Sequence, residues 1–397
     1  MSAKEHIRVA VIGVGGIARG QHIPGYLFCN DRAQGVGGPT VEIAAFCDVN
    51  ETSLQAMGAQ HGISRLTTDY CEVMAMEDID IVSICTWPDT HHQIAMAAIA
   101  AGKHIYCEKP LARTYPLAQE MCDAAHRAGV KTAVGFTHRL TPAAQLAHRL
   151  ITGGSLGEIY QMMAIYSMGG VDFAERALTP RRTRAVTGGG PLFELGPHMV
   201  DMVRWWTGQE ITAVCAQNRT YIKRRRWQDR EDWADVDIED ASTFLANLEG
   251  DTTCVFSHSS VITGRNFDQR VEVYGSRGAL LYDQARPFEL RACLGEEMVR
   301  LCASYGLYDP LWGLYRQEEP YPVIPVPREF VDAVPGARQG KPCRSYAPAL
   351  VAALHGETPE ILPTFEDGAR AQEVLDAVLL SAEERRWVDL PLDSQST

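Results

Sequence analysis

The first third of the chain alternates short apolar runs with segments of helical periodicity. The apolar runs predict strands at residues 7–12, 41–47, 79–85, 104–107 and 132–135, and the segments between them predict helices at 17–27, 51–61, 91–101 and 116–128. Short buried strands that alternate with helices are typical of an α/β fold with a doubly wound parallel sheet.

The pattern changes after residue 136 to longer runs in which apolar and polar residues alternate. These runs predict strands at 159–167, 241–248, 252–259, 269–274 and 279–283. Such alternation favours a large open, mainly antiparallel sheet with one face covered by helices. Residues 286–327 carry many Pro and Tyr with little periodicity, so we expect an irregular segment there, and a helix is predicted at 366–385. We therefore expect two domains, residues 1–136 and 137–397.

Composition narrows the class of protein. The chain has 397 residues, with 37 Lys and Arg against 50 Asp and Glu, for a net charge of −13. That charge argues against nucleic-acid binding, which needs a basic surface. The 11 Cys are too sparse for a disulfide scaffold and several end apolar runs, which suggests a reducing compartment. The chain start has no signal-peptide pattern, no apolar run is long enough to span a bilayer, and no Cys or His spacing fits a metal site. We expect a cytoplasmic protein without a membrane partner or a metal.

A glycine-rich turn, GVGGIA at residues 13–18, follows the first predicted strand and opens a helix. Gly13 permits a tight turn, Gly15 lets backbone N–H groups approach a pyrophosphate, and the small Ala18 lets the helix pack on the strand. Asp48 ends the second strand, where a carboxylate can bind a ribose hydroxyl. It lies 35 residues after Gly13, against roughly 20 in the usual pattern. We attribute the difference to a Gly-rich insertion at 30–40. The alternative is a turn that binds no ligand.

Two further motifs carry candidate chemistry. Glu108-Lys109-Pro110 follows a predicted strand, and the carboxyl ends of parallel strands are where such sheets bind ligands. Pro110 biases Lys109 away from helical angles. In the segment 188–201, Glu194 stands four residues before His198, close enough to reach the imidazole if a helix starts near Pro197. A solvated Glu-Lys pair and a buried, structurally satisfied His are the alternatives.

Together these motifs resemble the glucose-fructose oxidoreductase, inositol dehydrogenase and rhizopine-catabolism family, written Gfo/Idh/MocA. The residues that carry the resemblance are the turn at 13–18, TWPDTH at 86–91, GKHIYCEKPLA at 102–112, the segment 188–201 and FEDG at 365–368. The resemblance implies an NAD(P)-binding Rossmann domain at 1–136. It also implies that 137–397 form a substrate-binding and oligomerisation domain, whose open sheet joins a dimer or tetramer.

The resemblance also implies the roles of individual residues. Lys109 and His198 are the expected catalytic pair, with Glu194 as a third member that orients His198, binds substrate or acts as the base. The family more often has Asp at the position of Glu194. The expected cofactor-binding residues are Gly13, Gly15, Gly16, Ile17, Ala18, Asp48, Thr86, Pro88, His91, Glu108 and Lys109. The expected substrate-binding residues are Lys109, Arg139, Tyr166, Glu194 and His198.

The implied activity is reversible oxidation of a secondary alcohol on a sugar, glycoside or cyclitol. His198, with an ordinary pKa of ~6.5, is the expected base, and the Lys109 ammonium is expected to stabilise alkoxide charge. Asp48 would repel a 2′-phosphate and neither Val49 nor Asn50 offers a cation, so NAD is expected over NADP. An NAD-dependent glycoside hydrolase and a non-catalytic NAD-binding regulator remain alternatives.

Three smaller expectations concern single bonds and charge clusters. The resemblance implies that the Lys109–Pro110 bond is cis. Arg181, Arg182 and Arg184 could bind an anionic substituent, although solvated loop charges are the favoured interpretation. Residues 223–226, Lys-Arg-Arg-Arg, precede an acidic segment and are expected to pair with it or face water.

Overall fold

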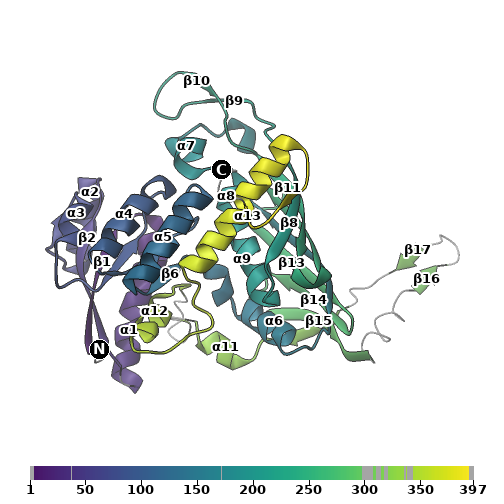
Figure 1. The fold of residues 1–397 in the computed structure, drawn as a ribbon, viewed down its shortest axis with the longest axis horizontal. Coiled ribbons are helices and arrows are strands. Elements are labelled where there is room, and N and C mark those ends of the chain that lie inside the picture. Colours follow the sequence, from purple (N-terminus) through teal and green to yellow (C-terminus); the bar gives the residue numbers. More distant parts are fainter. Residues whose placement is uncertain are drawn as a thin grey trace.

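The computed structural model describes residues 4–36, 38–170, 172–296, 307–309, 314–316, 321–334, 337 and 343–392. A parallel sheet with strand order β3-β2-β1-β4-β5-β6 forms the N-terminal half of the molecule (Figure 1). Its strands are β1 (His6–Ile12), β2 (Thr40–Cys47), β3 (Leu66–Thr67), β4 (Ile81–Ile84), β5 (His104–Cys107) and β6 (Thr132–Val134). This is the doubly wound order that binds nucleotides at its carboxyl edge.

Helices cover both faces of this sheet. They are α1 (Ile23–Val36), preceded by a π-helical turn (Ala18–His22), α2 (Glu51–His61), α3 (Tyr70–Met74), α4 (Pro88–Ala100) and α5 (Tyr115–Ala128). In β1, Ala10 and Ile12 face the core beneath α4 and α5, whereas Val9 and Val11 face the core beneath α1. Burial on both faces explains why the strands are apolar throughout rather than alternating.

A larger sheet, in the order β18-β15-β14-β13-β7-β12-β11-β8-β19, forms the other half. Its strands are β7 (Ile159–Ser167), β8 (Ile211–Arg219), β11 (Ala241–Leu248), β12 (Thr253–Ser259), β13 (Asp268–Gly275), β14 (Gly278–Asp283), β15 (Glu289–Leu294), β18 (Val323–Pro325) and β19 (Val388–Asp389). Only β7 and β12 pair in parallel among these described strands. The predicted fold class, a doubly wound sheet plus a mainly antiparallel one, is confirmed. Two small ribbons, β9 (Arg224–Arg226) with β10 (Trp233–Asp235) and β16 (Leu307–Asp309) with β17 (Leu314–Arg316), lie outside the large sheet.

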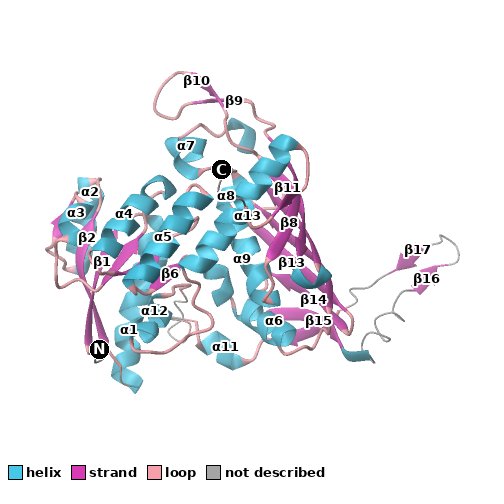
Figure 2. Ribbon diagram, in the orientation of Figure 1, coloured by secondary structure: helices cyan, strands magenta, loops and turns pink. Residues whose placement is uncertain are grey.

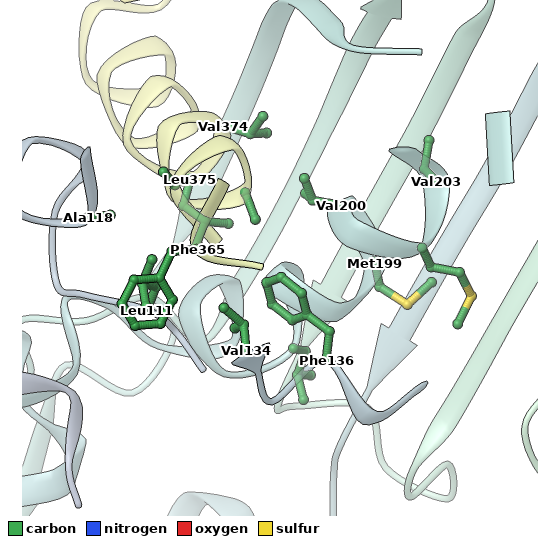
Figure 3. Close-up of a cluster of buried hydrophobic side chains, with 14 of the residues drawn as sticks. Leu111, Ala118, Val134, Phe136, Met199, Val200, Val203, Phe365, Val374 and Leu375 are labelled. Atoms are coloured by element: carbon green, nitrogen blue, oxygen red, sulfur yellow. The ribbon is translucent and has the colours of Figure 1, made fainter. Parts of the chain in front are cut away.

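Helices cover one face of the large sheet and join it to the N-terminal half (Figure 2). They are α6 (Pro142–Thr152), α9 (Gly196–Thr207) and α13 (Phe365–Glu384), with short helices α7 (Arg184–Thr187), α8 (Pro191–Glu194), α11 (Arg328–Asp332) and α12 (Ala347–Leu354). Figure 3 shows Phe365 and Leu375 of α13 packed near Leu111 and Phe136 of the N-terminal half and Val200 of α9. One continuous apolar core therefore fixes the two halves against each other.

Three predictions about elements need correction. The helix predicted at 17–27 ends too early, because α1 continues to Val36, into the glycine-rich segment 30–40. The Asn30 side chain there bonds both backbone groups of Val41. Residues 286–327 are not wholly irregular, because β15 and β18 extend the large sheet, although 297–306, 310–313 and 317–320 lie outside the described residues. Strand β8 was not predicted. Its second half, residues 215–219, is only partly buried or exposed, so the chain there lacks the alternation of apolar and polar residues that marks a strand. The Lys109–Pro110 bond is cis, as predicted.

Candidate functional site

The glycine turn lies at the carboxyl edge of the parallel sheet, between β1 and the π-helical turn. Gly13 has φ +87°, and a Cβ there would lie 2.8 Å from the Cys85 carbonyl carbon, so only glycine fits. Gly15 and Gly16 are exposed, and a Cβ on either would meet nothing within 4 Å. The backbone of this turn is therefore open to a ligand, while buried Ala18 packs the following helix onto the sheet.

Asp48 lies directly behind the glycine turn. One carboxylate oxygen accepts a hydrogen bond from the Val14 N–H at 2.8 Å, and the other accepts one from the Asn50 N–H, also at 2.8 Å. The carboxylate is thus held by the backbone of the turn. Neither Val49, which is exposed, nor Asn50 places a cation beside it.

A cleft of about 870 Å³ separates the glycine turn from the C-terminal half. Its lining includes the predicted residues Gly15, Gly16, Ile17, Thr86, Pro88, Glu108, Lys109 and Glu194. The opposite wall is formed by part of the segment between Met168 and Glu194, together with Arg225 and three residues close in sequence, Ile238, Glu239 and Asp240. This volume lies within the range of ligand-binding clefts.

His91 lies beneath the cleft rather than in it. Its ring is fully buried, with Nδ1 2.9 Å from the Pro110 carbonyl oxygen and Nε2 3.2 Å from the Thr86 carbonyl oxygen. Burial lowers the pKa of His91 below its usual value. The ring therefore holds together two loops that line the cleft, and its expected contact with a cofactor stays a prediction.

Glu108 belongs to a buried polar chain that sequence reasoning missed. Its carboxylate lies 3.0 Å from Nε2 of His22, whose Nδ1 lies 2.7 Å from the Ser83 hydroxyl, and the His22 ring stacks on Tyr106. Burial acts to raise the pKa of Glu108, but the His22 hydrogen bond and the Lys109 charge hold it below its usual value. Nothing in the sequence beside His22 marks it as a partner of a residue 86 positions away.

The Lys109 amine reaches across to the C-terminal half. Its Nζ donates a hydrogen bond of 2.7 Å to the main-chain carbonyl of Glu194, at the end of α8. Carbonyls at a helix end lack an intrahelical partner and attract cations. Burial lowers the pKa of Lys109, although the carboxylates of Glu194 and Glu108 act against this.

His198, in the first turn of α9, is 6% exposed and stacks on His138 with ring centroids 3.9 Å apart. Its Nδ1 has no hydrogen-bond partner in the described part of the chain. Burial, followed by the neighbouring His138 and the Lys109 charge, lowers the pKa of His198 well below 6.5. The imidazole is therefore neutral at neutral pH. His138 was not predicted as a neighbour of His198; its Nδ1 contacts the Gln269 side chain.

The Glu194 side chain does not make the expected contact with His198. Its carboxylate lines the cleft, half exposed, 4.0 Å from the Arg181 guanidinium. The backbone of Glu194 holds Lys109, and the side chain extends toward the arginine instead of the imidazole.

Three predicted substrate ligands do not line the cleft: His198, described above, Arg139 and Tyr166. Arg139 is 3% exposed, its guanidinium bonds both carboxylate oxygens of Asp201 and one of Asp367, and its side chain does not reach the cleft. Arg139 is therefore corrected to a structural residue. Tyr166 is buried against His138 and His198, with ring centroids 5.4 and 6.4 Å away, and does not line the cleft.

The arginine clusters divide differently from expectation. Arg181 and Arg182 line the cleft, whereas Arg184 bonds the Asp237 carbonyl outside it. In the second cluster, Arg224 and Arg226 are exposed and lie 3.4 Å from the carboxylates of Asp235 and Glu231, as expected. Arg225 also pairs with the acidic segment, since its guanidinium lies 3.7 Å from the Asp240 carboxylate, but this pair is buried and Arg225 lines the cleft.

The described residues lack two other kinds of feature, a metal-binding cluster and a membrane-spanning helix. No group of three or more His, Cys, Asp or Glu there could hold a metal ion. No helix in that part of the chain is long and apolar enough to cross a bilayer.

Comparison with known proteins gives matches over most of the chain. The model "Oxidoreductase family, NAD-binding Rossmann fold" matches residues 7–136, and "GFO/IDH/MocA C-terminal domain" matches 144–281. Levoglucosan dehydrogenase of Pseudarthrobacter phenanthrenivorans is 28% identical over 352 residues, which cover 83% of this chain and 85% of that protein. Inositol 2-dehydrogenase of Rhizobium meliloti is 25% identical over 360 residues, 89% of this chain and 93% of that protein. An NAD binding oxidoreductase from Klebsiella pneumoniae has a crystal structure similar at TM-score 0.81, with 27% identity and coverage of 98% and 100%.

Proposed function

This chain belongs to the GFO/IDH/MocA family of NAD-dependent oxidoreductases, and we propose that it reversibly oxidises a secondary hydroxyl group of a sugar, glycoside or inositol-type polyol. The observation that carries the proposal is that the Lys109 amine, held by the Glu194 carbonyl in the cleft beside the open glycine turn, is near enough to His198 for its charge to help lower the pKa of that imidazole. The dehydrogenases of levoglucosan and inositol among its relatives support this class of substrate.

The residues at the glycine turn fit a dinucleotide. The backbone at Gly15 and Gly16 faces the cleft with space that a Cβ would fill, and the turn opens a helix whose first N–H groups favour an anion. Thr86, Pro88 and Glu108 line the same side of the cleft and would border the cofactor. When bound, NAD⁺ supplies the acceptor for a hydride from the carbinol carbon.

His198 is the proposed base. A general base must be deprotonated before the reaction, and the lowered pKa of His198 keeps the imidazole neutral through the physiological range. The stacked His138 also lowers the pKa of His198, because positive charge on both of these adjacent rings would be repulsive.

Lys109 is proposed to orient the hydroxyl and to stabilise the alkoxide as its proton leaves. An ammonium in a partly buried cleft stabilises negative charge more than one in water does. The Glu194 carbonyl fixes the amine while leaving its other N–H groups free to donate. Glu194 acts here through its backbone, and its side chain is available to a substrate hydroxyl.

Cofactor preference is proposed to depend on Asp48. Its carboxylate is fixed behind the turn, where it would repel a 2′-phosphate, so NAD is preferred over NADP.

We also propose a homo-oligomer formed through the uncovered face of the large sheet. Leu245, Val255 and Met163 pair across β11, β12 and β7, and all three are at least partly exposed on the face opposite the helices. Adjacent exposed apolar side chains of this kind are typical of subunit interfaces. Light scattering should give a dimer or tetramer.

The test of the activity is absorbance of reduced nicotinamide across monosaccharides, glycosides, sugar acids and inositols, with NAD and NADP in parallel. NADH should form with at least one polyol. Sugar release from a glycoside without net NADH would instead identify a hydrolase. Tight NAD binding with no turnover across the panel would identify a regulatory protein.

A further inference from the structure

Four arginines from the C-terminal half line the cleft opposite the glycine turn: Arg176, Arg181, Arg182 and Arg225. None of them is on an element of the dinucleotide-binding sheet. Their concentration on one wall is unusual in a chain whose net charge is −13. These four cations differ in whether a carboxylate contacts them.

Buried Arg225 anchors the loop that carries the others. Its guanidinium donates to the Phe173 and Arg176 carbonyls, each at 2.8 Å, lies over the Phe173 ring, and faces the Asp240 carboxylate at 3.7 Å. This wall of the cleft is therefore fixed by a buried residue.

Two of the remaining arginines have acidic neighbours. Arg176 bonds both carboxylate oxygens of Asp172, at 2.9 and 3.2 Å. Arg181 has only the Glu194 carboxylate, at 4.0 Å, which is too far for a hydrogen bond and leaves its guanidinium donors open.

Arg182 has no carboxylate in contact with it in the part of the chain that the structure describes. Its partly buried side chain makes no hydrogen bond or ion pair within the described ranges of the chain. Burial, and then the charge of Arg176, lowers the pKa of Arg182, although the more distant charges of Glu194 and Asp172 act to raise it. A desolvated guanidinium without a counter-ion is costly unless a ligand supplies one.

The geometry also connects this wall to the reacting end of the cleft. Glu194 binds the Lys109 amine through its carbonyl and faces Arg181 through its carboxylate. A molecule with one hydroxyl at Lys109 could thus present a second group to the arginines.

We propose that Arg181 and Arg182 form an anion subsite, so that the preferred substrate is a sugar bearing a carboxylate or a phosphate. This rests on the proposed function, since it assigns a substrate class to the same site. A planar guanidinium binds either group through two parallel N–H donors. The dinucleotide pyrophosphate has its own backbone amides at the glycine turn and does not need this wall.

The test compares matched sugars that differ at one carbon: glucose, glucuronate and glucose 6-phosphate, with the corresponding galactose and mannose series. Wild-type protein should oxidise at least one anionic member with a KM about ten- to hundredfold below that of its neutral parent. Arg182→Gln should remove this advantage while KM for the neutral sugar stays within about twofold, and Arg181→Gln should reduce it. Comparison of carboxylate and phosphate members identifies the group. Arg224→Gln, an exposed arginine outside the cleft, is the matched control and should keep the wild-type ratio.

A second readout separates substrate from cofactor. NADH binding, followed by fluorescence, should have the same Kd in wild type and Arg182→Gln. A Kd raised tenfold in the variant would assign the arginine to the cofactor and overturn the proposal. Neutral sugars oxidised as well as anionic ones would also overturn it while leaving the dehydrogenase intact. Absence of turnover with every sugar would instead contradict the proposed function.

Discussion

Replacement of Arg139 by Met tests whether this arginine is structural. Arg139 is 3% exposed and donates hydrogen bonds at 2.8 Å to Asp201 and at 3.0 Å to Asp367. Burial opposes its charge, but the two carboxylates more than offset this and raise the pKa of Arg139. Met keeps an apolar chain of similar length and removes the cation, so Asp201, 1% exposed, is left without its main counter-ion.

The expected loss of stability is large. Removal of one partner from a buried ion pair costs about 3–5 kcal/mol, because the other charge stays buried and uncompensated. The loss should also depend on pH. Burial raises the pKa of Asp201 to about 6, although Arg139 acts against that rise. Without Arg139 the folded pKa rises further above the unfolded value. The folded variant then binds a proton that the unfolded chain does not, so its destabilisation shrinks as pH falls from 7 to 5.

Urea unfolding at pH 7 and pH 5 measures the loss of stability and its pH dependence. A double-mutant cycle adds the single variant Asp201→Leu and the double variant Arg139→Met with Asp201→Leu. The double variant should recover most of the loss, because it removes the uncompensated carboxylate as well. KM for the oxidised sugar should stay within about twofold in the folded single variant. A loss below about 1 kcal/mol at pH 7, together with a KM raised tenfold or more, would return Arg139 to the substrate site and refute the reasoning.

Four further predictions concern the chemistry and the choice of cofactor. His198→Ala should lower kcat by about 10²–10⁴-fold with the Kd for NAD unchanged. In the wild type, the lowered pKa of His198 should place the acid limb of kcat/KM for oxidation below pH 6.5, since the base is lost only when pH falls through its folded pKa; a limb at or above 6.5 contradicts this. Glu194→Gln should cost less than His198→Ala, because the backbone carbonyl that holds Lys109 remains, and a more damaging Gln variant would make Glu194 the base. Asp48→Ser should narrow the ratio of kcat/KM for NAD over NADP, and an unchanged ratio would show that selectivity lies elsewhere.

The sequence predicted those parts of the molecule whose signal is local. Strands buried on both faces, the glycine turn and the Glu108-Lys109-Pro110 segment are each readable within a few residues, because backbone conformation and strand ends determine them. The structure brings most of these residues to one cleft.

The residues that were missed depend on contacts between distant segments. His22 reaches Glu108 across 86 positions, and Arg139 reaches Asp201 across 62 and Asp367 across 228. An arginine is usually exposed and available to a ligand, but Arg139 is buried in the core by these contacts. The same holds for Arg225, which stands between two exposed arginines on a short strand whose middle residue faces inward. No local pattern distinguishes these cases from solvated charges.

In the proposed reaction a hydride moves from a sugar carbon to the nicotinamide, while Lys109 orients the hydroxyl group and His198 accepts its proton. The most direct measurement uses a substrate from the polyol panel deuterated at the carbon that is oxidised, with the reduced cofactor analysed by mass and NMR after one turnover. The account predicts that the deuterium appears at C4 of the nicotinamide in wild type, and at a rate lowered about 10²–10⁴-fold in His198→Ala. Deuterium retained on the sugar product, or transfer at the wild-type rate in His198→Ala, would contradict it.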